Sequence, residues 1–166
     1  MATHHSQITP EQQALIRESK LFFVASVEPQ LGAGPEGQGP VNVSPKGTVP
    51  LCILDERRVA YLDYHGSGNE TARHALAGGA VTIMLMSMQA DDAAIVRLYG
   101  HAEVEPIDRS PLAEQLFEAV PDCERKGLRQ VVTVHVQHTQ TSCGYGVPVF
   151  EFVAERESSQ RGRRFK

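Results

Sequence analysis

The segment RVAYLDYHGSGNETARHA, residues 58–75, combines residue types that could bind a phosphate. Its first part alternates in a period of two with β-branched and aromatic residues, which predicts a strand over 58–63. The glycines of 66–68 end that strand, and Asn69 is a suitable N-cap for a helix over 69–77. Such a junction offers backbone N–H groups, a hydroxyl and a helix start together, as a phosphate monoester requires. It therefore predicts phosphate binding, with a purely structural tight turn as the alternative.

Two other turns place a functional side chain beside glycine. The motif VNVSPKG, residues 41–47, puts Lys46 in a turn, where its ammonium group could bind a phosphate. An exposed turn lysine without a ligand is the alternative. The motif TSCGYGVP, residues 141–148, holds Tyr145 between two glycines, so that a ligand could approach the backbone and stack on the ring. A loop that only packs on the protein is the alternative.

The bulk composition excludes several classes of function. The 166 residues carry a net charge of −4 and 41% hydrophobic residues, so we expect one globular domain without affinity for nucleic acid. No apolar run approaches the roughly 20 residues that span a bilayer, and the three cysteines are widely spaced. We therefore expect a cytoplasmic protein with reduced thiols and no membrane association. The domain is predicted over 1–154, followed by a basic, flexible tail over 155–166.

A metal centre is not expected. His135 and His138 lie three residues apart in a predicted strand, which would put them on opposite faces.

The remaining pattern predicts a mainly β protein. Short links between most strands favour antiparallel pairing, and only one junction resembles a βαβ crossover. A closed antiparallel barrel with peripheral helices is therefore favoured over a doubly wound parallel sheet. The expected strands are 21–27, 41–44, 49–54, 58–63, 80–87, 95–104 and 131–136, with 147–153 extended; the expected helices are 9–20, 69–77 and 108–120, the last capped by Asp108.

Taken together, these segments resemble the pyridoxamine 5′-phosphate oxidase-like family of FMN-binding split barrels. The resemblance implies a six-stranded antiparallel split β-barrel with about three helices. It also implies a homodimer, with an FMN site at each end of the subunit interface and residues of both chains in each site. The motifs that carry it are FFVAS at 22–26, VNVSPKG at 41–47, RVAYLDYHGSGNETARH at 58–74, RLYGHAEV at 97–104 and TSCGYGVP at 141–148.

The resemblance also implies which residues bind the cofactor. Ser67 matches the serine that binds the phosphate, strand 61–63 would lie along the flavin and its ribityl chain, and 42–46 would run beside the isoalloxazine ring. The full implied set is Asn42, Val43, Ser44, Lys46, Tyr61, Leu62, Asp63, Ser67, Gly68, Asn69, Thr71, Arg73, Cys143 and Tyr145.

The chain departs from the true oxidases in two places. Their phosphate turn reads Ser-Arg-Lys where this chain has Ser67-Gly68-Asn69, so two positive charges are absent, and Asn69, backbone N–H groups and Arg73 are the candidates to compensate. The chain also has no Trp, whereas the oxidases hold pyridoxal phosphate with an arginine-and-tryptophan ending.

The implied function is an FMN-dependent oxidoreductase of the short branch of the family, with an unknown substrate and no assigned catalytic residue. A flavin carrier or sensor without turnover is one alternative. A split barrel that holds heme or a deazaflavin in place of FMN is another.

Overall fold

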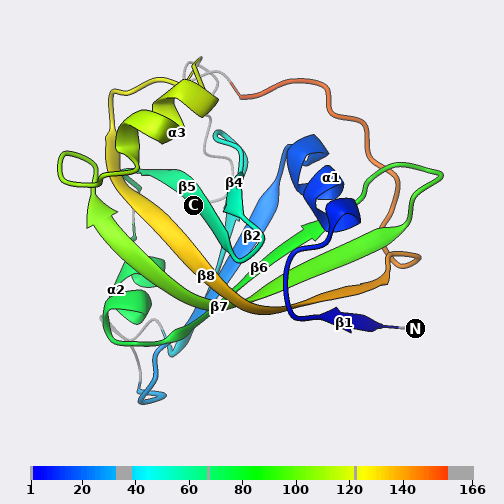
Figure 1. Cartoon of the computed structure of the whole chain (residues 1–166), viewed down its shortest axis with the longest axis horizontal. Coiled ribbons are helices and arrows are strands. Elements are labelled where there is room, and N and C mark those ends of the chain that lie inside the picture. The colour runs from blue at the N-terminus through cyan, green and yellow to red at the C-terminus, as the bar shows by residue number, and fades with distance from the viewer. Residues whose placement is uncertain (1, 33–38, 67, 122, 157–166) are drawn as a thin grey trace.

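One antiparallel sheet of eight strands forms most of the molecule in the computed structural model, which describes residues 2–32, 39–66, 68–121 and 123–156 (Figure 1). The strands follow the order β3-β2-β6-β7-β8-β5-β4, and β1 pairs with β8. Within the described residues β3 and β4 are not paired with each other, so the barrel is split between them. The strands are β1 Thr3–His5, β2 Phe22–Val27, β3 Val41–Lys46, β4 Cys52–Asp55, β5 Arg58–Tyr64, β6 Ala80–Met86, β7 Ala94–Pro106 and β8 Leu128–Cys143.

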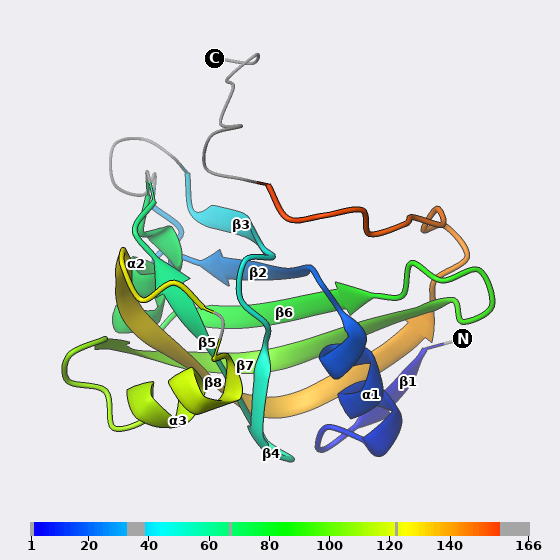
Figure 2. The same ribbon diagram turned by 90° about the horizontal axis from the view of Figure 1, so that it is seen from above.

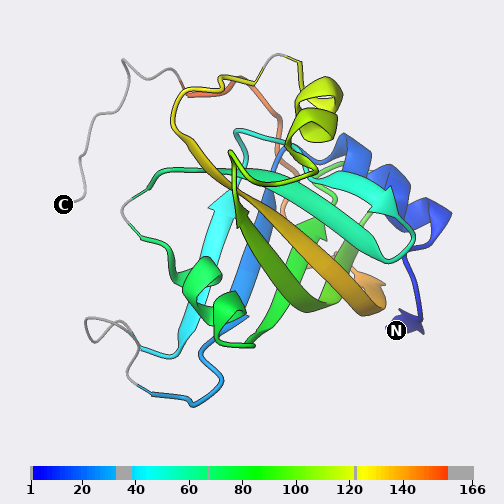
Figure 3. The same ribbon diagram turned by 60° about the vertical axis from the view of Figure 1, so that its left-hand side comes forward.

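The described residues form three helices, which lie around this sheet. Figures 2 and 3 show the arrangement from two further directions. Helix α1, Pro10–Glu18, begins with the capping box that Thr9 and Gln12 form. Helix α2, Glu70–Leu76, contacts β2, β6 and β7, and helix α3, Ala113–Ala119, contacts β5. The predicted mainly β split barrel with about three helices is confirmed, but the described sheet has eight strands and not six, because β1 and β4 add to it. No helix among the described residues has the length and apolar character that a membrane crossing needs.

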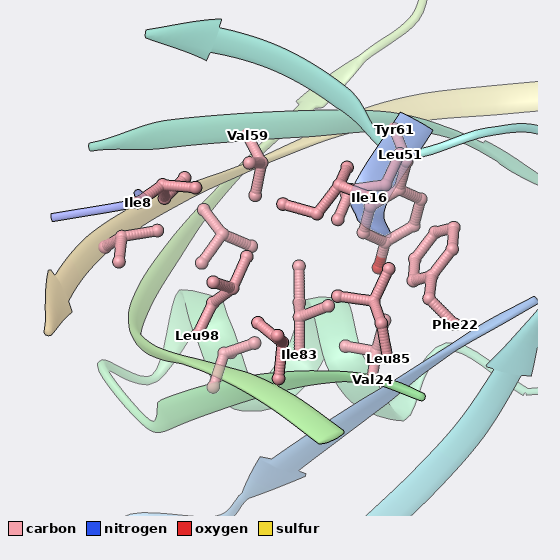
Figure 4. Packing of buried hydrophobic residues seen from close by; sticks show 14 of the residues in the cluster. Ile8, Ile16, Phe22, Val24, Leu51, Val59, Tyr61, Ile83, Leu85 and Leu98 are labelled. Atoms are coloured by element: carbon pink, nitrogen blue, oxygen red, sulfur yellow. The ribbon is translucent and has the colours of Figure 1, made fainter. Parts of the chain in front are cut away.

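Strand β5 has no solvent-facing side over most of its length. Val59 and Tyr61 point into the barrel, where they pack in the main core that Figure 4 shows. Ala60 and Leu62 point the other way, into a second core beneath α3. The alternation in the sequence is therefore between two apolar environments, not between core and water.

A bulge in β8 changes which of its residues share a face. Tyr99 lies opposite His138 and Gly100 lies opposite Val136, so Gln137 is the extra residue. Because the bulge shifts the alternation by one residue, His135 and His138 lie on the same face of the strand. The prediction that they face opposite sides was wrong, since a period of two holds only in a regular strand.

The third helix is shorter than predicted. It begins at Ala113 with Leu112 at the N-cap position, and not at Asp108. The N–H groups of Arg109 and Ser110 both bond to the carbonyl of Pro106 in a turn, and Pro111 disfavours helical backbone at the residue before it.

Other boundaries moved as well. Strand β8 is much longer than the predicted 131–136, β4 begins at Cys52, and 147–153 contains no strand. The short strand β1 was not predicted. The proposed basic tail lies mostly outside the described residues.

The Tyr61 hydroxyl yields the first prediction. Its side chain is 1% exposed, its ring meets Phe22 edge-on at 5.4 Å, and among the described residues the hydroxyl has no hydrogen-bond partner. Burial raises the pKa of Tyr61, so the group stays neutral. Removing an unsatisfied buried hydroxyl relieves a desolvation cost, so we expect Tyr61→Phe to raise the free energy of unfolding by about 1 kcal/mol.

Urea denaturation measures this change. Tyr99→Phe is the matched control, because the Tyr99 hydroxyl donates to Gln140 at 2.9 Å, and its loss should destabilise by about 0.5 kcal/mol. A loss of stability in Tyr61→Phe would contradict the expectation and indicate a buried water at the hydroxyl.

Candidate functional site

Polar side chains gather where β3, β5 and the start of β8 meet. In β3, Asn42, Ser44 and Lys46 face the barrel, because the β2 residues paired with them face its core. These side chains line a cleft of about 500 Å³. That volume lies within the usual range of small-molecule sites, roughly 300–1,000 Å³. The other lining residues are Gly39, Val41, Tyr64, Gly66, Gly68, Glu70 and Arg129.

The carboxylate of Asp63 is the centre of a polar network beneath this cleft. Asp63 is 5% exposed and follows Tyr61 on the inward face of β5. One carboxylate oxygen accepts from Lys46 Nζ at 2.7 Å. The other accepts from Arg129 Nε at 2.9 Å and from Gln130 Nε2 at 2.8 Å. One acid therefore holds a lysine from β3 and an arginine from β8 in fixed positions.

The ionisation of Asp63 follows from these contacts. Burial alone would raise its pKa, but the hydrogen bonds and charges of Lys46 and then Arg129 outweigh burial and hold the pKa below its ordinary value. Asp63 is therefore a carboxylate at neutral pH. Lys46 and Arg129 are thus two cations around this one anion, and the carboxylate of Glu70, which also lines the cleft, pairs with Arg73.

Gln130 connects the same carboxylate to the turn before α2. Its Nε2 also donates to Asn69 Oδ1 at 2.9 Å. Asn69 occupies the N-cap position of α2, as predicted, but its side chain makes no capping hydrogen bond. Its oxygen is used by Gln130 instead. Asn42 of β3 donates to the Thr71 hydroxyl at 3.2 Å, which joins β3 to the first turn of α2.

Gly68 lies between a cation and an anion. Its carbonyl accepts from Arg129 Nη1 at 3.0 Å. A Cβ built on Gly68 would collide with the carboxylate of Glu70. Glu70 in turn pairs with Arg73 at 3.1 Å. A side chain at position 68 would therefore require Glu70 to move.

The structure brings together only part of the predicted site. Asn42, Ser44, Lys46 and Gly68 line the cleft; Asp63, Asn69, Thr71 and Arg73 support it through the contacts above. Ser67 lies outside the described residues, and its role stays a prediction.

Other predicted residues lie away from the cleft. The side chains of Tyr61 and Leu62 are buried in the two cores, so at these two positions only the backbone could touch a ligand. Val43 faces outward and is 61% exposed. Cys143 and Tyr145 lie at and just beyond the far end of β8.

Arg129, Gln130 and Glu70 were missed by sequence reasoning. Glu70 is in the quoted motif, but as an acid it gave no reason for a role in binding an anion. Arg129 and Gln130 lie more than 60 residues after Asp63 and reach it because Asp63 pairs with Gln130 across β5 and β8. In the sequence, Arg129 and Gln130 are only polar residues at the start of a strand. That pattern does not indicate a binding site.

The family model described as pyridoxamine 5′-phosphate oxidase matches residues 8–143 of this chain. The chain belongs to the pyridoxamine 5′-phosphate oxidase family. The family match covers every described residue of the cleft and the network beneath it.

A curated relative agrees with this membership. A pyridoxamine 5′-phosphate oxidase family protein of Aspergillus flavus, ustO, is 32% identical over 142 residues, which cover 84% of this chain. The chain spans about half of that relative, 53% of its length.

Two solved structures share the fold. An FMN-binding protein of Syntrophomonas wolfei is 11% identical, with a TM-score of 0.53 over 75% of this chain and 80% of that chain. HutZ, the heme storage protein of Vibrio cholerae, is 19% identical, with a TM-score of 0.51 over 80% of this chain and 93% of that chain. At these identities the likeness establishes the fold alone.

The Asp63 network generates the second prediction. Asp63→Asn keeps the shape of the side chain but leaves Lys46 and Arg129 without their shared anion. We expect a loss of about 3 kcal/mol in the free energy of unfolding at pH 7. Because the folded-state pKa lies below the ordinary value of about 3.9, the charged carboxylate stabilises the fold above that pH. The stabilisation disappears as the pH falls through the folded-state pKa.

Denaturation curves of both proteins at pH 7 and at successively lower pH test this sign. The difference between them should shrink below about pH 4. Asp55→Asn is the control, because Asp55 is exposed and forms an ion pair with the exposed Arg58, while its contact with the Arg57 N–H can also be made by an amide oxygen. The substitution should cost well under 1 kcal/mol. A difference for Asp63→Asn that does not depend on pH would refute the assignment of a charged Asp63.

Proposed function

We propose that this protein binds FMN in the cleft between β3 and the start of β8 and acts as an FMN-dependent oxidoreductase. The observation that carries the proposal is the donor set of the cleft in a chain of this family. Lys46 and Arg129 supply positive charge, and Asn42 and Ser44 supply an amide and a hydroxyl. These groups match a ligand with an anionic phosphate and a polar ring edge.

The residues present fit such a cofactor. Asn42, Ser44 and Lys46 recur every second residue on one face of β3, so a planar ring could lie along that strand. Arg129 and the turn with Gly68 lie at the other side of the cleft, where a phosphate would need them. The cleft volume of about 500 Å³ admits a mononucleotide rather than a fragment.

Bound FMN would supply hydride and electron transfer chemistry, which the protein then need not provide. The chain's own residues would orient the ring and set the charge around it. Lys46 is held by Asp63 within reach of the cleft, and there it would favour negative charge on a ligand.

Heme and deazaflavin remain the alternatives within this fold. Heme iron is usually held by His, Cys, Met or Tyr side chains. Tyr64 is the one such residue in the described lining of the cleft, and its hydroxyl donates to the carbonyl of Glu124 at 2.6 Å. The donor set therefore favours FMN over heme. A carrier or sensor without turnover would use the same contacts.

The third prediction tests FMN binding directly. Purified protein should take up FMN and show the absorbance bands of a flavin, at roughly 370 and 450 nm. Lys46→Ala should weaken FMN binding about tenfold, because a charge-assisted contact is lost. Lys20→Ala is the control, since Lys20 is exposed and does not line the cleft.

Anaerobic addition of NADPH then separates the alternatives. Bleaching of the bound flavin supports the oxidoreductase; bound flavin that never bleaches favours a carrier or another donor. The proposal would be refuted if the protein took up no flavin. Binding of heme and of a deazaflavin would then be tested.

The proposed function includes a homodimer. The outward face of β3 exposes Val41 and Val43, 62% and 61% exposed. Phe23 of β2 and Met84 of β6 pair in register with each other and continue this face, because cross-strand partners share a side of the sheet. A contiguous apolar face of this kind supports association with a second copy.

The fourth prediction concerns this face. Val43→Asp places a charge in the proposed interface, so we expect the mass in solution to fall to that of one 18.2 kDa chain. Light scattering after size exclusion measures it. Leu76→Asp is the matched control, because Leu76 is 75% exposed on α2 and should leave the mass unchanged. A wild-type protein that is already monomeric would exclude the dimer.

A further inference from the structure

Arg129 is the least expected basic residue of the cleft, because it comes from a different part of the chain than the glycine turn. Its side chain is 15% exposed. Its Nε donates to the buried Asp63, its Nη2 lies 2.8 Å from the same carboxylate oxygen, and its Nη1 donates to the carbonyl of Gly68. A guanidinium has more N–H donors than these two acceptors use. Because Arg129 lines the cleft, its remaining N–H donors can reach a ligand there.

Two contacts fix the position of this guanidinium before any ligand arrives. Asp63 holds it from β5, and the Gly68 carbonyl holds it against the turn before α2. An arginine pre-positioned in this way loses little side-chain entropy on binding a ligand. Asp63 also cancels one of the two positive charges, so Lys46 and Arg129 can lie near each other without a large repulsion.

Gln130 sets the orientation of a second donor. The Asp63 carboxylate can only accept, so the end of Gln130 that faces it must be the NH₂ group. The same NH₂ group contacts Asn69, so the Asn69 atom at that contact must be its oxygen. The amide NH₂ of Asn69 is then left for another partner, and none among the described residues accepts from it.

We infer that Arg129, with the Asn69 amide beside it, anchors the phosphate of the bound nucleotide and makes the site select a phosphomonoester over an uncharged flavin. This inference rests on the proposed FMN function. In this arrangement the positive charge at the phosphate comes from Arg129 on β8. The turn contributes Gly68 and Asn69, neither of which is charged. The absence of a side chain at Gly68 is part of the arrangement, because a Cβ there would collide with the Glu70 carboxylate beside the turn whose carbonyl the guanidinium contacts.

A comparison of FMN with riboflavin tests the assignment, because the two differ only in the phosphate. Flavin fluorescence titrations give both dissociation constants. Arg129→Gln should weaken FMN binding by about tenfold to a hundredfold and change riboflavin binding less than about twofold. Arg129→Lys should give an intermediate loss for FMN, because an ammonium keeps the charge without the planar fork.

Arg125→Gln is the matched control. Arg125 is 64% exposed, packs over Phe117 at 4.0 Å and does not line the cleft. Its removal should change neither dissociation constant. Equal losses for FMN and riboflavin in Arg129→Gln and Arg129→Lys would overturn the inference, because they would show a structural role only. An unchanged FMN affinity would overturn it as well.

Inorganic phosphate provides a readout that does not depend on flavin. Phosphate should raise the Tm of the wild-type protein and of Arg125→Gln, but not of Arg129→Gln. If the wild-type protein takes up no flavin and phosphate still protects it through Arg129, the FMN function fails and the anion site stands. If neither phosphate nor FMN responds to Arg129, the inference fails.

Discussion

The ion pairs of Asp63 are the interaction on which the cleft depends. Three segments that are distant in the sequence, β3, β5 and β8, meet at this one carboxylate through Lys46, Asp63 and Arg129. Without the anion, two cations would face each other across a partly buried space, and neither would have a defined position. The network extends through Gln130 to the turn before α2, so the same acid also sets the geometry of Asn69. The apolar cores stabilise the barrel, whereas Asp63 positions the polar side chains where β3, β5 and β8 meet.

Much of the fold could be predicted from local sequence pattern. The capping box at Thr9, the strand-turn-helix junction and the alternation in β7 each depend on neighbouring residues, and each occurs where expected. The failures have non-local causes. The bulge at Gln137 forms where β8 meets β7, at a glycine whose added Cβ would strike the carbonyl of His135. No spacing rule within β8 alone contains that information. Pro111, by contrast, was a local signal for the start of α3 that was overlooked.

The candidate site divides in the same way. Lys46 and Gly68 belong to recognisable motifs, and the cleft contains both. The prediction that Lys46 lies in a turn was wrong, because β3 continues to Lys46, which pairs with Phe22 of β2. The resemblance extended the site to Cys143 and Tyr145, but within one chain these lie at and beyond the other end of a 16-residue strand. They could join a site only through a second copy. Arg129 and Gln130 could not be found, because their importance comes from the register between β5 and β8 and not from their neighbours in the chain.

The burial of β5 on both faces has a further consequence for how the cleft moves. It pairs with β8 along its length and with β4 near its start, and its side chains lie between two cores, so its amides should exchange with solvent slowly. In the part of the chain that the structure describes, strand β3 is at the end of the sheet and pairs on one side only, so its amides should exchange through small local openings. One wall of the cleft is thus anchored to a strand that should exchange slowly, and the other to an edge strand that should exchange faster. A ligand that bridges the two walls should therefore slow amide exchange mainly in β3. The fluctuations of β3 would then set how easily the cleft admits or releases the ligand.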